Sequence, residues 1–122
     1  MRKMITLLFS ALLMMGCKGG NEFTSVDART FAEVIANDKV QFIDARTPEE
    51  YTQGHIPGAV NIDVNNPDFD THIKGLDKKR PVAVYCRSGR RSKIAAERLA
   101  KQGFKVTELN EGILSWQGEV VK

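Results

Sequence analysis

One of the two cysteines in this chain stands where a reactive sulfur could be held. Cys86 follows an apolar run, Val82–Tyr85, and precedes a polar loop with three arginines, a serine and a glycine. A segment with helical spacing begins near Ser92. This order places a thiol at the carboxyl end of a buried strand, opposite the amino end of a helix, where anions bind and the pKa of a thiol falls. The arrangement predicts covalent chemistry by a sulfur nucleophile.

The loop after the cysteine supplies groups that could hold a negative charge. Its backbone N–H groups can turn toward Cys86, and Gly89 can adopt a backbone shape that other residues resist. The helix that follows adds the positive end of its dipole, and guanidinium groups favour an oxyanion. We therefore expect Cys86 to be catalytic and the whole loop to bind the substrate, through Arg87, Ser88, Gly89, Arg90 and Arg91.

Segments with strand-like and helix-like patterns alternate along the rest of the chain. Strands are expected over residues 23–26, 40–44, 59–62, 82–85 and 105–109. Helices are expected over residues 30–37, 49–53, 65–74, 92–102 and 112–118. The alternation predicts one α/β domain with a small, mostly parallel sheet of about five strands. Ligands of such sheets bind beyond the carboxyl ends of the strands, and Cys86 lies at such a position.

Two stretches of the sequence resemble conserved motifs of the rhodanese family of sulfurtransferases. The first, residues 44–62, contains Asp-x-Arg, Glu-Tyr, Gly-His-Ile and Gly-Ala elements. The second is the run Cys-Arg-Ser-Gly-Arg-Arg-Ser at residues 86–92, which is similar to the active-site loop of that family. In a weaker third element, residues 110–116, Glu111 stands where the family usually has the first glycine of a pair. The resemblance covers residues 23–118 and implies a rhodanese-like fold with helices on both faces of the sheet.

The resemblance also implies an enzyme, a rhodanese-type thiosulfate sulfurtransferase. The Cys86 thiolate would take a sulfane sulfur from a small anionic donor such as thiosulfate and become a persulfide. A thiophilic acceptor, either cyanide or a thiol, protein thiols included, would then take the outer sulfur and restore the thiolate. This is covalent catalysis in two steps. It requires no cofactor, and it requires no separate general base if the thiol is already ionised.

Other functions stay open from the residues alone. A rhodanese-like domain could carry sulfur as a persulfide, or dock a partner, without turnover. A phosphatase or arsenate reductase of the Cys-x5-Arg class also uses a thiolate, but that class needs an arginine where this chain has Ser92. Cys86 could also be a small buried hydrophobe, as lone cysteines often are. The polar loop argues against that last interpretation, because a core cysteine does not need it.

Several residues near these motifs are expected to have structural roles. Asp44, Arg46 and Glu50 are expected to form a salt bridge and hydrogen bonds that fix the loop after the second strand. Arg90 and Lys93 are expected to lie on a solvated face of the loop and helix. Turn or packing positions are expected for His55, Tyr51 and Trp116.

The first 17 residues have the pattern of a secretory signal. A basic start precedes an apolar run, which is shorter than the ~20 residues of a membrane-spanning helix. The residues before Cys17 resemble a bacterial lipobox, so Cys17 is expected to carry lipid and to become the new N-terminus. Residues 18–22 would form a tether, and residues 23–122 the rhodanese-like domain. We therefore expect an exported lipoprotein, anchored in a membrane and facing the periplasm or cell surface; an ordinary secreted protein and an uncleaved anchor are the alternatives.

The charge of the chain gives no reason to expect a nucleic-acid partner. Lysine and arginine number 18 against 15 acidic residues, a formal net charge of +3, and two of the basic residues would leave with the signal. The basic residues are spread along the chain apart from residues 78–80 and the loop around Cys86. A nucleic-acid-binding protein shows a basic patch or stripe instead.

The cysteines and histidines do not form a metal-binding pattern. His55 and His72 stand far apart, and no Cys-x-x-Cys is present, so no metal site is expected. If Cys17 carries lipid, Cys86 is the sole free thiol of an exported protein. An unpaired cysteine in such a protein points to a reactive thiol.

Overall fold

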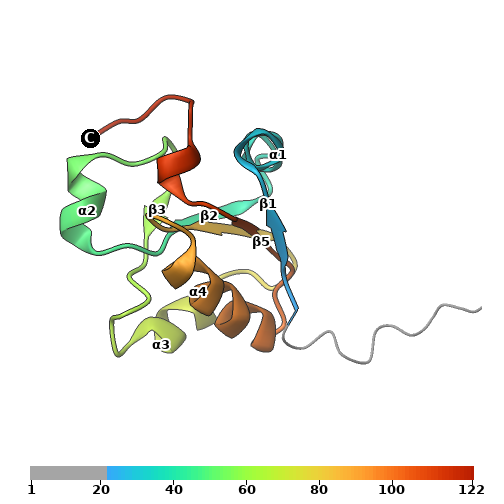
Figure 1. The fold of residues 1–122 in the computed structure, drawn as a ribbon. Coiled ribbons are helices and arrows are strands. Elements are labelled where there is room, and N and C mark those ends of the chain that lie inside the picture. Colours follow the sequence, from blue (N-terminus) through green and yellow to red (C-terminus); the bar gives the residue numbers. More distant parts are fainter. Residues whose placement is uncertain (1–21) are drawn as a thin grey trace, which may run out of the picture.

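Five parallel strands form one sheet in the computed structural model of the protein, which describes residues 22–122. Across the sheet the strands run in the order β1-β5-β4-β2-β3 (Figure 1). Their bounds are β1 Thr24–Val26, β2 Gln41–Asp44, β3 Val60–Asn61, β4 Val82–Tyr85 and β5 Val106–Leu109. The expected α/β fold is confirmed, and the sheet is parallel throughout.

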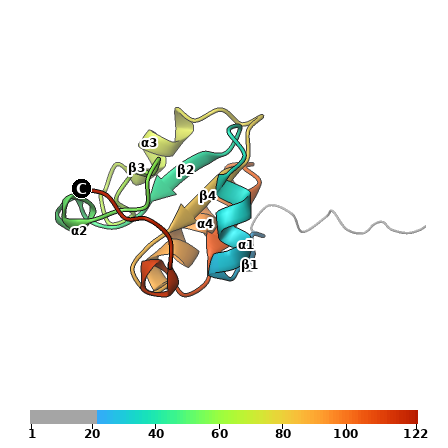
Figure 2. The same ribbon diagram turned by 90° about the horizontal axis from the view of Figure 1, so that it is seen from above.

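Helices cover both faces of this sheet, as expected. Their bounds are α1 Ala28–Ile35, α2 Pro48–Gln53, α3 Phe69–Lys74, α4 Arg90–Lys101 and a 3-10 turn, η3, Ile113–Ser115. α3 and α4 lie on one face and α1 lies on the other (Figure 1 and Figure 2). The C-terminal segment runs beside α2, where His55 and Val121 form an antiparallel bridge.

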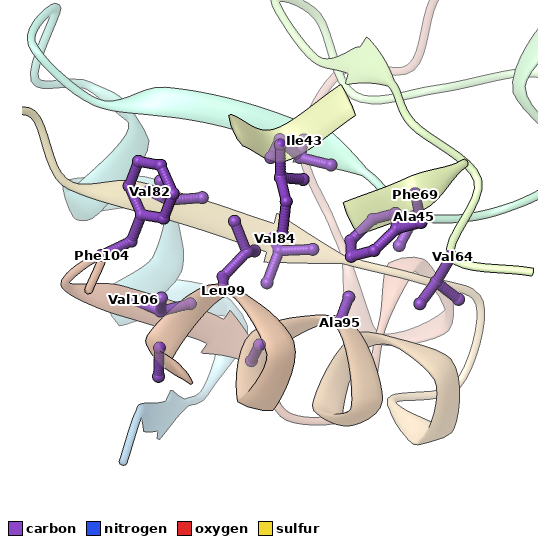
Figure 3. Close-up of a cluster of buried hydrophobic side chains, with 13 residues drawn as sticks. Ile43, Ala45, Val64, Phe69, Val82, Val84, Ala95, Leu99, Phe104 and Val106 are labelled. Carbon is purple, nitrogen blue, oxygen red and sulfur yellow. The ribbon is translucent and has the colours of Figure 1, made fainter. Parts of the chain in front are cut away.

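The central strand β4 divides two hydrophobic clusters. All four of its residues are buried, as its uniformly apolar sequence predicts for an inner parallel strand. Val82 and Val84 face α4 and pack in the larger cluster, which includes Leu99 and Phe69 (Figure 3). Ala83 and Tyr85 point to the opposite face, toward α1. The sheet therefore places the residue after Tyr85, which is Cys86, between two packed layers.

Local sequence signals explain how the shorter helices begin. Asp27 is the N-cap of α1, as expected, and its carboxylate accepts the N–H of Thr30 at 2.9 Å. α2 begins with Pro48 and a capping box in which Thr47 and Glu50 satisfy each other's backbone N–H groups. The helix expected over residues 112–118 is only the turn η3.

α4 begins two residues before the expected position, and this shift matters for the site. Its N-cap is Gly89, with φ 102°, so the helix starts directly after the loop. Ser92 is therefore in the first turn, and its side chain is fully buried. The sequence pattern missed this start because a glycine cap gives no side-chain signal, unlike an Asp or Ser cap.

Three expectations on the first 21 residues lie outside the described part of the chain. These are the signal peptide, the lipid on Cys17 and most of the tether. Between residues 22 and 122, none of the helices is long and apolar enough to cross a membrane.

Candidate active site

Cys86 lies directly after β4, at the carboxyl edge of the sheet, and its sulfur faces polar groups. The residue is 1% exposed. The N–H of Gly89 donates a hydrogen bond to Cys86 Sγ at 3.1 Å, and the sulfur is 3.4 Å from Ser92 Oγ. Both partners belong to the start of the 12-residue helix α4. The amide and the helix end thus bring partial positive charge to the sulfur.

A second segment packs against the loop and fixes its shape. Ile113 N–H donates to the carbonyl of Cys86 at 2.9 Å, and Leu114 N–H donates to the carbonyl of Arg87 at 3.2 Å. Gly112 has a positive φ of 67°, and a Cβ there would overlap the carbonyl of Arg87. The close approach thus requires a glycine at position 112. Position 111 is exposed, so Glu111 is tolerated where the family usually has another glycine.

Gly89 is confined on the opposite side of the loop. With its positive φ, it takes a left-handed conformation that glycine adopts without strain. A Cβ at this position would overlap the carbonyl of Asn110, which follows β5. The amide that contacts Cys86 is therefore held by backbone on both sides of the loop.

A buried carboxylate lies behind the cysteine. Glu108 on β5 is fully buried, and Ser92 Oγ donates to its Oε2 at 2.5 Å. Ser25 on β1 donates to Oε1 at 2.5 Å, and Lys93 Nζ lies 3.3 Å from Oε2. The Lys93 side chain stays 41% exposed, as expected, but its ammonium was not expected to reach this site. It also donates to the carbonyls of Gly89 and Asn110.

Glu108 was not among the residues expected at the site, although the sequence carries a signal for it. Val106–Leu109 was expected to be a strand, and β5 is an inner strand between β1 and β4. A charged residue inside such a strand must be paired or hydrogen-bonded. The partners come from β1 and α4, which are far from Glu108 in sequence, so the sequence could flag the carboxylate but not its position behind Cys86.

The residues expected to bind substrate fall into two groups. Arg87, Ser88 and Arg90 are exposed on the loop, whereas Gly89 is buried. Arg91 instead forms a two-pronged ion pair with Glu50 of α2, at 2.7 and 2.9 Å. The guanidinium groups of Arg87 and Arg90 are thus the ones that the loop presents to solvent.

The ion pair with Arg91 sets the charge state of Glu50. Hydrogen bonds from Arg91 outweigh partial burial and lower the pKa of Glu50 to about 2. Hydrogen bonds to Glu50 raise the pKa of Arg91, and the charge of Cys86 contributes in the same direction. The pair therefore ties α2 to the first turn of α4 and keeps a cation within electrostatic range of the sulfur.

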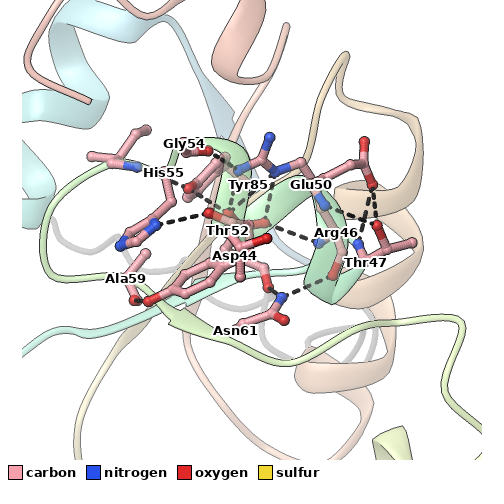
Figure 4. Close-up of polar contacts among 12 residues, drawn as sticks. Asp44, Arg46, Thr47, Glu50, Thr52, Gly54, His55, Ala59, Asn61 and Tyr85 are labelled. Atoms are coloured by element: carbon pink, nitrogen blue, oxygen red, sulfur yellow. Dashed lines mark hydrogen bonds and ion pairs between the residues drawn. The ribbon is translucent and has the colours of Figure 1, made fainter. Parts of the chain in front are cut away.

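A buried polar network supports the site from β2 (Figure 4). Asp44 and Arg46 form a salt bridge at 2.7 Å, and Tyr85 O–H donates to Asp44 at 2.6 Å. Arg46 also donates to the carbonyl of Gly54 at 2.7 Å, and Tyr85 accepts the N–H of Ile56 at 3.1 Å. The expected structural role of Asp44 and Arg46 is confirmed.

The network fixes the protonation of its members. Burial opposes the charge of Arg46, but its bonds to Asp44 raise its pKa overall. Burial and the bond to Asp44 raise the pKa of Tyr85, so the phenol stays protonated and donates. The strand end that carries Cys86 is therefore held to β2 and to the start of the next loop.

The aromatic residues near the first motif pack as expected. Tyr51 donates to the carbonyl of Ala59 at 2.7 Å, and the His55 ring stacks on Tyr51 with centroids 3.7 Å apart. Trp116 meets Phe31 edge to face. These contacts give the three residues structural roles.

A shallow hollow lies beside the loop. Its volume is about 300 Å³, and its lining includes Arg87, Glu50, Leu114 and Val120. Leu114 and Val120 are exposed large hydrophobic residues, at 63% and 49%. In the part of the chain from residue 22 onward, no three His, Cys, Asp or Glu side chains are grouped to hold a metal ion.

The Glu50→Gln variant tests the ion pair between α2 and α4. The lowered pKa means that the stabilising charge is fully present above pH 4.5, the ordinary value, and is lost as the pH falls toward 2. Both side chains are about one quarter exposed, and solvent screening reduces the pair to about 1–2 kcal/mol. Near neutral pH, the free energy of unfolding measured with denaturant should be larger for wild type than for Glu50→Gln by that amount. The difference between the two proteins should vanish as the pH approaches 2. A difference that stays constant across this range would contradict the ion pair.

Comparison with known proteins agrees with this geometry. The family model described as Rhodanese-like domain matches residues 27–119. YtwF of Bacillus subtilis, a candidate sulfurtransferase, is 36% identical over 87 residues, which are 71% of this chain and 82% of that protein. A sulfurtransferase of Allochromatium vinosum is 34% identical over 93 residues, 75% of this chain and 85% of that protein.

A solved structure shows the same fold. A rhodanese-related protein from Thermoplasma volcanium superposes with a TM-score of 0.72 at 29% identity, over 81% of this chain and 98% of that chain. The matched residues contain strands β2 to β5, the loop after Cys86 and the segment that packs against it, while β1 lies just before them. The chain therefore belongs to the family of rhodanese-like domains, and its relatives include sulfurtransferases.

Proposed function

We propose that this protein transfers a sulfane sulfur from an anionic donor such as thiosulfate, through a persulfide on Cys86, to a thiophilic acceptor. One observation carries the proposal. The sulfur of Cys86 accepts the N–H of Gly89 at the first residue before α4, at the carboxyl edge of the sheet. A backbone N–H directed at the sulfur stabilises negative charge that develops on it during the reaction. The sulfurtransferases among the relatives support the same reaction class.

The two steps balance without a cofactor. The Cys86 thiolate attacks the outer sulfur of thiosulfate, a new sulfur–sulfur bond forms, and sulfite leaves with the electron pair of the broken bond. The persulfide carries the negative charge on its outer sulfur. Cyanide or a thiolate then attacks that sulfur, and the electron pair returns to Cys86. The thiolate that starts the first step and the thiolate that ends the second both lie on Cys86 Sγ, which the amide and the helix end can stabilise.

An anionic donor fits the charge of the loop. Arg87 and Arg90 are exposed beside Cys86 and can contact an oxyanion with charge-assisted hydrogen bonds. A rhodanese from E. coli, 35% identical with a TM-score of 0.56 over 68% of this chain and 98% of that chain, is described as a structure with anions. This description supports, for this chain, a donor with an anionic group.

A sulfur carrier without turnover is the second candidate. YrkF of Bacillus subtilis, a candidate sulfur carrier protein, is 31% identical over 110 residues, and this chain spans 58% of its length. A carrier would load Cys86 but would release the sulfur only to a protein partner. The phosphatase interpretation has less support. The arginine that the Cys-x5-Arg class needs is replaced by Ser92, whose hydroxyl donates to Glu108.

We also propose that the protein is exported and anchored to a membrane through lipid on Cys17. The support is the basic start, the apolar run and the small residue before Cys17 in the sequence. Anchoring that is firm requires more than one acyl chain. A lipid on Cys17 would place the domain at a membrane surface, with residues 18–22 as the tether.

Intact-mass analysis tests the transfer reaction. Protein incubated with thiosulfate should gain the mass of one sulfur atom, and cyanide should remove it. Cys86→Ser should gain nothing, because the hydroxyl cannot take the sulfane sulfur. Mass unchanged in wild type would contradict the proposal, while loading without multiple turnovers would favour the carrier. The same measurement on the full-length protein from its native host reports the lipid on Cys17.

The Arg87→Ala variant tests recognition of the anion. A charge-assisted hydrogen bond contributes ~1.5 kcal/mol or more, so KM for thiosulfate should rise roughly tenfold. KM for an uncharged persulfide donor should change little, because that donor offers no oxyanion. Lys101→Ala is the matched control, since it removes a cation at the far end of α4. Equal effects of Arg87→Ala on both donors would remove the case for arginine-mediated binding.

A further inference from the structure

A line of three buried side chains runs inward from the reacting sulfur. Cys86 and Ser92 lie 3.4 Å apart, and Ser92 and Glu108 lie 2.5 Å apart. Cys86 is 1% exposed, and the other two are fully buried. The reaction proposed above uses Cys86 alone, so the role of Ser92 and the buried carboxylate is still unassigned.

The line has two protonation states in which every hydrogen-bonding group has a partner. A serine hydroxyl has one proton to donate and lone pairs to accept with. When Glu108 is ionised, Ser92 donates to Glu108 and accepts the S–H of Cys86. When Cys86 is ionised, the sulfur needs a donor, and Ser92 can turn its proton to the sulfur only if Glu108 holds a proton and donates to Ser92. Each state satisfies every member of the line.

We propose that Ser92 and Glu108 form a proton relay that takes the thiol proton of Cys86. The S–H bond breaks and leaves its electron pair on sulfur, the proton joins Ser92 Oγ, and the original hydroxyl proton joins Glu108 Oε2. The total charge of the buried line does not change, so no new charge is created away from water. Ser92, which touches the sulfur, is a catalytic residue, and Glu108 acts through it as a positioning residue. The relay deepens the proposed sulfur transfer and rests on it.

The charged groups at the two ends of the relay favour opposite protonation states. Lys93 of α4 lies 3.3 Å from Glu108 Oε2 and favours the ionised carboxylate, while Ser25 of β1 donates to the other oxygen. On the side of the sulfur, the Gly89 amide and the nearby Arg91, itself paired with Glu50 of α2, favour the thiolate. Cations thus stand at both ends of the line, and neither end is left without a partner for its negative charge.

The pH dependence of Cys86 alkylation by iodoacetamide tests the relay. Two groups that share a proton titrate in two coupled steps. As the pH rises, the alkylation rate of wild type should therefore increase in two steps. After the first step one proton is shared between Cys86 and Glu108, so a fraction of the molecules carry the thiolate. Glu108→Gln keeps an acceptor for Ser92 but binds no proton, so it should show one step. Its rate in the range of the first step should fall roughly 100-fold, the lower end of a general-base effect.

Two variants complete the design. Ser92→Ala interrupts the relay but keeps Glu108, and it should also show one step. Glu97→Gln, which removes an exposed carboxylate from the outer side of α4, should keep both steps. The relay would be overturned if wild type showed a single step with the same midpoint as Glu108→Gln. It would also be overturned if Glu108→Gln kept two steps, and Glu108 would then have a purely structural role.

A second measurement does not depend on the variants folding. In wild type, infrared spectra between the two steps should show the carbonyl band of a buried, protonated carboxyl group, and carbon-isotope labelling of glutamate should shift it. No such band would overturn the proposal. Sulfur loading is read separately from intact mass, so two alkylation steps without loading would refute sulfur transfer alone. Loading with one step would refute the relay alone.

Discussion

The turn between β4 and α4 keeps its shape because the chain returns against it at Gly112. The carbonyls of Cys86 and Arg87 accept N–H groups from Ile113 and Leu114, and no side chain separates the two segments. The turn therefore cannot open outward without losing both bonds. With the backbone held in this way, the Gly89 amide points at the sulfur, and the first turn of α4 begins beside it.

Two ion pairs connect this turn to β2 and α2. A buried salt bridge stabilises a fold only when its remaining hydrogen-bonding groups are satisfied. In the pair of Asp44 and Arg46, Tyr85 donates to the carboxylate, and the carbonyl of Gly54 accepts from the guanidinium. The pair thereby joins the ends of β2 and β4 and, through Gly54, holds the C-terminal end of α2. Glu50 on α2 forms an ion pair with Arg91, which connects α2 to the first turn of α4.

Much of this arrangement could be predicted from the sequence. The apolar run of β4, the alternation of elements, the N-cap Asp27 and the helix start at Pro48 are local signals, and the structure confirms them. The structural role of Asp44 and Arg46 was also predictable, because both belong to a motif with a familiar pattern. The motifs further indicated the family, which the matching family model confirms.

The parts that could not be predicted depend on contacts between distant segments. Gly89 caps α4 without a side chain, so the pattern placed the helix start two residues late and gave no sign that the Lys93 ammonium reaches Glu108. Glu108 is 16 residues from Ser92 in sequence, and only the pairing of β4 with β5 brings it behind the sulfur. The hydrogen bonds from Ile113 and Leu114 to the loop likewise follow from the return of the chain, which no local pattern shows.

The contact between the Gly89 amide and the Cys86 sulfur can be observed directly by NMR. When thiosulfate loads the protein, the account predicts that the Gly89 N–H resonance shifts strongly, since its acceptor changes from a thiol or thiolate to a persulfide. Cyanide should return the resonance to its starting position, and Cys86→Ser should show no change with thiosulfate. A Gly89 resonance that stays in place while the intact mass shows a loaded sulfur would contradict the central claim that this amide holds the reacting sulfur.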